Sequence, residues 1–376
     1  MTLRAAAAAL AVVLATATAA SASGSIRVAI VDNARAAELR GSDIEITELG
    51  ACERCAPSGA RGSIVRATVA GGGVEIDGRR ASGFRLRSDR SIRLNGRDYA
   101  PPLDVLKNGE GLVVITELPL EEYLVGVLRA ESSEKWPLEA LRAQAIVART
   151  YAAYQRALAA GKPYHIIAST AHQQYFGRVP ATSPLWTAVG DTAGQVLRWE
   201  GGLFPAFYHT ESGGYTEDPR MVFAARNMPA LKPVRDEFSV ASPHYYWNLD
   251  VRLADLSEIL RKNDAAVGTV TAIDVTERTP SLRAAVVTVH GTRGSTRLRG
   301  NDFRRMIGYD TFKSTLFAVA VDDAWARFAG RGYGHGVGMS QWGAKGMAER
   351  GYSARQILEF YYPGTVFGSL TGHTLQ

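Results

Sequence analysis

The sequence predicts an α+β protein with a β-rich N-terminal module, a helical core that also contains strands, and an inserted small α/β unit. Short runs rich in Val and Ile recur over residues 26–115, separated by Gly, Asn, Asp or Ser, which is the pattern of short strands and turns. From Pro119 onward, apolar residues recur at helical spacing. Strand and helix patterns mix between residues 245 and 320, which indicates the inserted unit.

Composition limits the class of protein. A chain of 376 residues is long enough for two or three domains. Its apolar fraction of 46% and charged fraction of 21% are those of an ordinary globular protein, so a disordered chain or a multispan membrane protein is excluded. The net charge of +6 is mild over this length, and no dense block of Lys and Arg occurs. Nucleic acid is therefore not an expected partner.

Residues 1–22 have the order of a secretory signal peptide. Arg4 is followed by an uncharged apolar run and then by Ala20-Ser21-Ala22, a small-residue cleavage site. The apolar run is shorter than the roughly 20 residues that a spanning helix needs. We expect cleavage after Ala22, with an uncleaved anchor as the alternative. The mature protein would then be exported to the periplasm or cell envelope without an integral membrane segment.

The two cysteines of the sequence, Cys52 and Cys55, lie close together. Thiols outside the cytoplasm tend to oxidise. A zinc site of the CxxC kind needs two further ligands, and none occur nearby. We therefore expect a small disulfide between Cys52 and Cys55 that closes a turn.

Two helices are predicted on either side of Glu131. Pro119 and the acidic residues after it favour a helix start. Pro137 begins a second helix, which Gly161 ends. Glu131 then lies in the corner between the helices, where desolvation of its carboxyl would raise its pKa and let it hold a proton near neutral pH. A solvated surface glutamate is the alternative.

Residues 195–217 are expected to form two strands, joined by a turn at Gly201-Gly202 and followed by a glycine-rich bend. His209 ends the second strand, either as a ligand-contacting residue or as a histidine bonded to backbone. Ser212 lies in TESGG, which is not the G-x-S-x-G elbow of a serine hydrolase. No HExxH array occurs, so a zinc peptidase is not expected.

Residues 330–344, GRGYGHGVGMSQWGA, alternate glycine with larger residues. If this segment is extended, four glycines share one face, which suits close packing against a neighbouring strand or a floor for a flat ligand. Such a floor would carry His335, Gln341 and Trp342. The Lys-Ser/Thr of a phosphate loop is absent, and too little chain follows for a dinucleotide-binding unit. A capping box at 353–356 precedes a last helix.

Three long motifs occur in the order LPLEEYLVGVLRAESSEKWPLEALRAQAIVARTYA, FYHTESGGYTED and GRGYGHGVGMSQWGAKGMAERGYSARQILEFYYPGT. Together they closely resemble the stage II sporulation protein D (SpoIID)/LytB family of exported cell-wall proteins. The resemblance implies a peptidoglycan lytic transglycosylase that cleaves between N-acetylmuramic acid (MurNAc) and N-acetylglucosamine (GlcNAc) and leaves a 1,6-anhydro end. Other members were described as enhancers of cell-wall amidases. A non-catalytic, glycan-binding enhancer with an amidase partner is therefore the alternative.

The resemblance also implies domain limits. They are a signal peptide at 1–22, an N-terminal β module at 23–115, a catalytic core at 116–220 and 317–376, and the inserted α/β unit at 221–316. The core would combine helices with strands around a groove for glycan strands.

Glu131, after GVLRA, matches the catalytic acid of the family, and Arg142 stands where the family often has Lys near that acid. The residues expected to bind substrate in the groove are Arg142, His209, Ser212, Tyr333, His335, Gln341 and Trp342. The glycine-rich segment would form the floor of this groove, with Tyr333 or Trp342 as an aromatic edge.

One departure from the family concerns zinc. Some members bind zinc through cysteines and histidines in the segment that here reads YHIIASTAHQQYFG. This chain has no cysteine there, and Ile167 and His172 stand at those places. No zinc or other cofactor is therefore expected.

The implied chemistry needs one carboxyl group. Ordinary glycosidases use two carboxylates, because water or an enzyme nucleophile attacks the sugar. A transglycosylase uses the C6 hydroxyl of the substrate itself, which is already held in place. One residue can then protonate the leaving oxygen and accept the proton of the C6 hydroxyl. Glu131 is the residue expected to do both.

Overall fold

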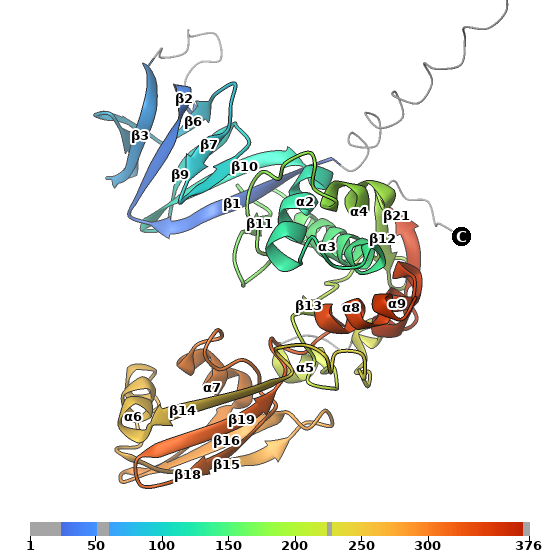
Figure 1. Ribbon diagram of the computed structural model, residues 1–376. Helices are drawn as coiled ribbons and strands as arrows, with labels where there is room; N and C mark the ends of the chain where they lie inside the picture. Colours follow the sequence, from blue (N-terminus) through green and yellow to red (C-terminus); the bar gives the residue numbers. More distant parts are fainter. Residues whose placement is uncertain (1–23, 51–59, 224–227, 371–376) are drawn as a thin grey trace, which may run out of the picture. The chain divides into compact units, whose positions relative to one another are not determined.

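The computed structural model describes residues 24–50, 60–223 and 228–370. The predicted signal peptide and the predicted Cys52–Cys55 disulfide lie outside these residues. The chain forms two compact units (Figure 1). The first unit comprises residues 1–135, 144–205 and 366–376, and the second comprises residues 136–143 and 206–365. Helices and strands occur in both, in agreement with the predicted α+β class. Across the described ranges, no helix is long and apolar enough to cross a membrane.

One large sheet dominates the first unit, with strands where the Val- and Ile-rich runs predict them. Its strands are β1 (Ser25–Ala34), β2 (Ala36–Glu48), β3 (Ala60–Ala70), β4 (Gly73–Ile76), β5 (Arg79–Ala81), β6 (Gly83–Arg87), β7 (Ile92–Leu94), β8 (Arg97–Tyr99), β9 (Leu103–Asn108), β10 (Gly111–Pro119) and β11 (Ile166–Ile167). The main order is β11-β1-β10-β9-β6-β2-β3-β4-β5, and β7 pairs with β2 and β8. Asp77-Gly78 and Asn95-Gly96 make the tight turns β4–β5 and β7–β8, because both residues of each pair have positive φ.

The helices of the first unit follow β10 directly. They are α2 (Leu120–Glu131), the greater part of α3 (Leu138–Leu158) and α4 (Leu185–Asp191). Pro119 precedes α2, and Glu121 and Glu122 lie in its first turn, as the sequence predicts. The small side chains along α3, Ala145, Ala148 and Ala152 among them, are fully buried. The helix begins after Pro119 and ends before Ser132, which places Glu131 at the last position of α2.

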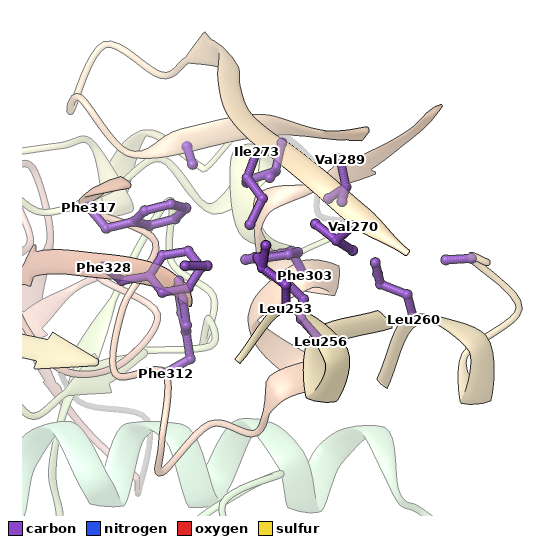
Figure 2. Packing of buried hydrophobic residues seen from close by; sticks show 14 of the residues in the cluster. Leu253, Leu256, Leu260, Val270, Ile273, Val289, Phe303, Phe312, Phe317 and Phe328 are labelled. Carbon is purple, nitrogen blue, oxygen red and sulfur yellow. The ribbon is translucent and has the colours of Figure 1, made fainter. Parts of the chain in front are cut away.

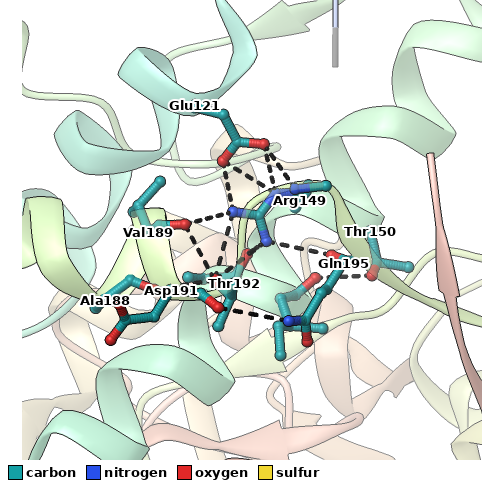
Figure 3. Close-up of polar contacts among 11 residues, drawn as sticks. Glu121, Arg149, Thr150, Ala188, Val189, Asp191, Thr192 and Gln195 are labelled. Atoms are coloured by element: carbon teal, nitrogen blue, oxygen red, sulfur yellow. Dashed lines mark hydrogen bonds and ion pairs between the residues drawn. The ribbon is translucent and has the colours of Figure 1, made fainter. Parts of the chain in front are cut away.

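A buried ion pair joins α2 to α3 (Figure 3). Arg149, which is fully buried, donates from Nη2 to Glu121 Oε2 at 2.5 Å and from Nε to Glu121 Oε1 at 2.9 Å. The same guanidinium donates to the carbonyl oxygens of Val189 and Gln195, and the amide of Gly194 donates to Glu121 at 3.1 Å. Arg149 thus connects both long helices to the end of α4 and to β12 (Gln195–Arg198).

The second unit contains most of the remaining elements. They are β13 (Tyr208–His209), α5 (Pro219–Val222), a short 3₁₀ helix (Pro229–Leu231), β14 (Tyr246–Arg252), α6 (Leu253–Lys262), β15 (Val270–Arg278), β16 (Ala284–Gly291), β17 (Gly294–Arg299), α7 (Gly300–Ile307), β18 (Phe317–Val321), β19 (Trp325–Arg331), β20 (Met339–Ser340), α8 (Gln341–Glu349) and α9 (Ala354–Tyr361). The capping box predicted at 353–356 is present at the start of α9.

Two three-stranded sheets, β14-β19-β18 and β15-β16-β17, share an apolar core with α6 and α7 (Figure 2). Phe312 packs in this core with its ring centroid 5.0 Å from those of both Phe317 and Phe328. The core therefore continues through β18 and β19, beyond the limit at residue 316 that the sequence predicts for the inserted unit.

The prediction that two strands within residues 195–217 pair with each other is wrong. The turn at Gly201-Gly202 exists, but only a single bridge between Trp199 and Gly202 closes it. Instead, β12 pairs with β21 (Val366–Ser369), and β13 pairs in parallel with β20. Pro205 lacks a backbone donor, so a continuous ladder from β12 is disfavoured. The partners that replace it lie more than 100 residues away, where local spacing gives no signal.

Replacing Arg149 with Met is expected to lower the free energy of unfolding by about 3–5 kcal/mol, because the carboxylate of Glu121 would be left buried without its partner. Urea denaturation followed by circular dichroism measures this change. Arg129→Met is the matched control, because Arg129 is an exposed arginine whose contact with Glu134 is 3.8 Å long. Equal losses in the two variants would contradict a central role for Arg149.

Candidate active site

Glu131 lies in the first unit, where its side chain is half-buried. The amide of Gln174 donates to Glu131 Oε1 at 2.9 Å. Ser132 ends the helix in extended conformation and donates its amide to the carbonyl of Leu128. Burial, with the nearby Tyr175 hydroxyl and Glu131 carboxyl as further causes, raises the pKa of Tyr123 well above its usual value. The carboxyl of Glu131 is thus held by a backbone donor close to a tyrosine that stays protonated.

Arg142 and the other predicted site residues belong to the second unit. Arg142 donates to Glu139 on the same helix, and Glu139 Oε2 accepts from the amide of Ala354 at 2.7 Å. This pair ties the first turns of α3 to the start of α9. The contact of Arg142 with a glycan remains a prediction.

Two segments far apart in the sequence run side by side in the second unit. Tyr208 and His209 pair with Met339 and Ser340, and Glu211 forms a bridge with Tyr333. The amide of Trp342 donates to the carbonyl of Thr210 at 3.1 Å. The pairing brings together His209, Ser212, Tyr333, His335, Gln341 and Trp342.

The glycine-rich segment is not an extended floor for a sugar. Gly332, Gly334, Gly336 and Gly338 all have positive φ, between 72° and 113°, so the chain coils instead of extending. A Cβ on Gly334 would lie 2.8 Å from His209 Cβ, and one on Gly338 would overlap the carbonyl oxygen of Phe207. Protein atoms therefore fill the space that the missing side chains leave, and the close-packing interpretation holds.

His209 and His335 form a pair of neutral imidazoles, with ring centroids 5.5 Å apart. His209 is 4% exposed and its Nδ1 lies 3.1 Å from the carbonyl oxygen of Val337. Burial lowers its pKa well below the usual value, and the charge of Arg283 adds to this. Although part of His335 stays exposed, loss of hydration around its ring lowers its pKa to about 3. Both rings can exchange hydrogen bonds, but neither carries charge at neutral pH.

A buried carboxyl pair lies beside these histidines. Glu211 is fully buried and accepts from the amide of Gly213 at 3.0 Å. Burial, with the nearby charge of Asp236 as a smaller cause, raises its pKa to about 7. Ser212, also fully buried, donates its hydroxyl to Asp236 Oδ2 at 2.7 Å. Burial raises the pKa of Asp236 as well.

Arg283 reaches this cluster from the inserted region. It is 1% exposed, donates from Nη2 to the carbonyl oxygen of Ser212 at 2.6 Å, and packs against Gly336. Sequence reasoning missed Glu211, Asp236 and Arg283. The run HTESGG does contain Glu211, but nothing local shows that a carboxylate and an arginine from distant segments join it.

Partly exposed aromatic residues form what we call the aromatic row, namely Trp136, Trp342, His244 and Tyr333. Their ring centroids are 5.4 Å apart for Trp136–Trp342, 6.2 Å for Trp342–His244 and 5.5 Å for His244–Tyr333. Lys345 Nζ lies 5.2 Å from the ring of Trp342. Two of these residues, Trp342 and Tyr333, were predicted from sequence, while Trp136 and His244 were not. The interplanar angles of 66°, 75° and 68° make these three contacts edge-to-face, so the row presents separate ring faces and edges instead of one flat surface.

The described part of the chain contains no group of three or more His, Cys, Asp and Glu residues that could hold a metal ion. His172 accepts from the amide of Ile167 through Nδ1 at 3.1 Å, and burial lowers its pKa. The two residues at the zinc-ligand places of some relatives are thus bonded to each other.

Comparison with known proteins finds a matching family and relatives that cover between 65% and 75% of the chain. The family described as Stage II sporulation protein matches residues 108–199, and a domain of unknown function, DUF8618, matches residues 226–338. The chain is 30% identical to the stage II sporulation protein D of Bacillus amyloliquefaciens over 66% of its length and 74% of the relative's. It is also 30% identical to the amidase enhancer of Bacillus subtilis over 65% of this chain, although only 40% of that relative is covered. An uncharacterized protein of Brachyspira hyodysenteriae is 30% identical over 75% of each chain.

Glu211 makes stability depend on pH. Because its folded-state pKa of about 7 exceeds its ordinary value of 4.5, its contribution is present at low pH and is lost as pH rises through 7. Between pH 4.5 and 8, the wild type should lose about 3 kcal/mol relative to Glu211→Gln. Urea titrations at a series of pH values measure this difference. Glu237→Gln, which changes an exposed glutamate, is the control. A difference in unfolding free energy between the wild type and Glu211→Gln that stays constant over this pH range would contradict the burial argument.

Gly338→Ala is expected to destabilise the fold by at least about 3 kcal/mol, because the added methyl meets the Phe207 carbonyl in a strained backbone conformation. Gly351→Ala is the control, since its φ of +89° carries the same strain but its added methyl meets open space. It should cost only about 1 kcal/mol. Thermal melts compare the two variants. Similar losses of stability would contradict close packing at Gly338 and would favour a glycine face that is open to a ligand.

Proposed function

Because the chain belongs to the stage II sporulation protein D family, we propose that it is an exported lytic transglycosylase of the bacterial cell wall. Its substrate is the glycan strand of peptidoglycan, and it cleaves the bond between MurNAc and GlcNAc to leave 1,6-anhydro-MurNAc ends. The observation that carries this proposal is Glu131, a half-buried carboxyl at the end of α2 with a backbone donor on one oxygen.

Glu131 supplies both proton transfers of the reaction. The protonated carboxyl gives its proton to the oxygen that leaves with GlcNAc, and the bond from C1 of MurNAc to that oxygen breaks. The C6 hydroxyl of the same MurNAc forms a new bond to C1, and its proton passes to the Glu131 carboxylate. The carboxyl is then protonated again, so each turnover ends where it began, without water and without a metal.

The second unit supports a role in holding neutral sugars. The aromatic row offers flat apolar faces of the kind on which pyranose rings stack. His335, uncharged at neutral pH and partly exposed, can exchange hydrogen bonds with hydroxyl and acetamido groups. Arg142 remains the proposed partner of a glycan carboxylate or acetamido oxygen.

A binding protein that stimulates a cell-wall amidase is the second candidate. It is favoured by the relative named amidase enhancer and by the burial of His209, Ser212 and Gln341, which leaves the aromatic row as the more accessible surface. In this case the chain would bind glycan and recruit the amidase, and Glu131 would perform no chemistry.

A digestion of purified peptidoglycan, both intact and stripped of stem peptides, distinguishes the two candidate functions. Mass spectrometry of the products should show 1,6-anhydro-MurNAc ends with the wild type. Glu131→Gln should reduce their rate of formation by about 10²–10⁴, because the acid and base are one residue. Glu134→Gln, three residues along the chain, should cut at the wild-type rate.

Intact glycan in every sample, with protein that still sediments with the wall, would overturn catalysis and favour the enhancer. Equal cleavage by the wild type and Glu131→Gln would keep the activity but remove Glu131 from it.

A further inference from the structure

The second unit contains a hollow that is separate from the aromatic row and from the buried His209–Glu211 cluster. Its volume is about 580 Å³, within the roughly 300–1,000 Å³ of small-ligand sites. It lies on the outer face of the sheet β14-β19-β18, where Asn248, Ala329 and Ala318 stand in one row across the three strands. The two alanines leave the space, and the exposed side of Asn248 offers both an amide donor and an acceptor.

Apolar groups surround this row. Tyr246, which pairs with Arg331 in the neighbouring strand, is 71% exposed, and Leu282 is 51% exposed. Leu316 and Phe317 complete the apolar lining. Large apolar side chains that remain exposed around a concave surface mark a binding site rather than a random patch.

The charge of the hollow is positive and unbalanced. Among the described residues, the guanidinium of Arg331 has no ion-pair or hydrogen-bond partner, and no carboxylate lines the hollow. Within the described ranges, the guanidinium of Arg278 donates only to the carbonyl oxygens of Leu282 and Phe317. By contrast, Arg327, two pleats away on the same face of β19, pairs with Asp250 and Asp322. The sheet neutralises one arginine and leaves the other available to an anion.

We propose that this hollow binds an acidic peptide, specifically the stem peptide that branches from the glycan. The inference deepens the proposed function and rests on it for the choice of peptide. Alanine methyl groups of the stem would fill the space over Ala318 and Ala329, and Asn248 would bond a peptide amide. Arg331 would donate to a free carboxylate in a charge-assisted pair. In the intact wall the lactyl carboxyl of MurNAc is bound in the amide to the first alanine of the stem, so the free carboxylates lie on the stem peptide.

Isothermal titration calorimetry of the full exported chain with acetyl-L-Ala-γ-D-Glu-L-Lys-D-Ala tests this proposal. The wild type should bind this peptide but not its fully amidated form. Arg331→Gln should weaken binding at least about tenfold, since a charged hydrogen bond is lost. Ala318→Glu, on the exposed face of an edge strand, should abolish binding through its bulk and its negative charge. Arg293→Gln removes an exposed charge outside the hollow and should bind as the wild type does.

Absence of peptide binding, equal affinity of the amidated peptide, or unchanged binding in Ala318→Glu would each overturn the proposal. Displacement of the peptide by chitotetraose would assign the hollow to sugar and would also overturn it. Glu131→Gln should keep full peptide affinity. A chain that binds the peptide but fails to cleave wall glycan would therefore reject the proposed catalysis and leave this site standing, and the reverse result would do the opposite.

Discussion

The buried ion pair between Glu121 and Arg149 is the interaction on which the geometry of the proposed acid depends. Glu121 lies in the first turn of α2 and Glu131 at its last residue, about 15 Å along the helix axis. Arg149 fixes that first turn to α3, to the end of α4 and to β12 (Figure 3). Because an α-helix is rigid over this length, fixing its first turn also fixes the position of Glu131 at its end. The Glu121–Arg149 pair therefore determines where the Glu131 carboxyl lies without contacting it. The amide of Gln174 then fixes its orientation.

The second unit separates two kinds of surface chemistry. Around β13 and β20, titratable groups are buried so deeply that the histidines stay neutral and Glu211 holds its proton up to a pH near 7. Positive φ at four glycines lets backbone and imidazole pack this closely. The aromatic row and these neutral groups suit uncharged sugars, whereas the arginines on the sheet β14-β19-β18 suit carboxylates. A wall polymer made of neutral sugars and acidic peptides presents both.

Features of the fold that depend on residues close in the sequence could be predicted, whereas those that depend on distant partners could not. The strands that coincide with the Val- and Ile-rich runs, the limits of α2 and the capping box of α9 follow from turn residues, Pro119 and the Ser353–Gln356 spacing, which act over a few residues, whereas β11 was not predicted. The burial of Arg149 was not predicted, because it depends on Glu121, 28 residues away. Alternating glycines suggested an extended floor, but their conformation depends on Phe207, His209 and Arg283 packing into the spaces they leave. Long-range partners of this kind leave no local pattern.

The central claim is that one carboxyl, Glu131, cleaves the glycan by using the substrate's own C6 hydroxyl. Digestion of peptidoglycan in water enriched in heavy oxygen, followed by mass spectrometry of the new MurNAc ends, tests it most directly. Attack by the C6 hydroxyl gives 1,6-anhydro ends that carry no heavy oxygen, which is the result predicted here. Reducing ends that carry one heavy oxygen would show attack by water, and a mechanism with one carboxyl and no water would then be contradicted.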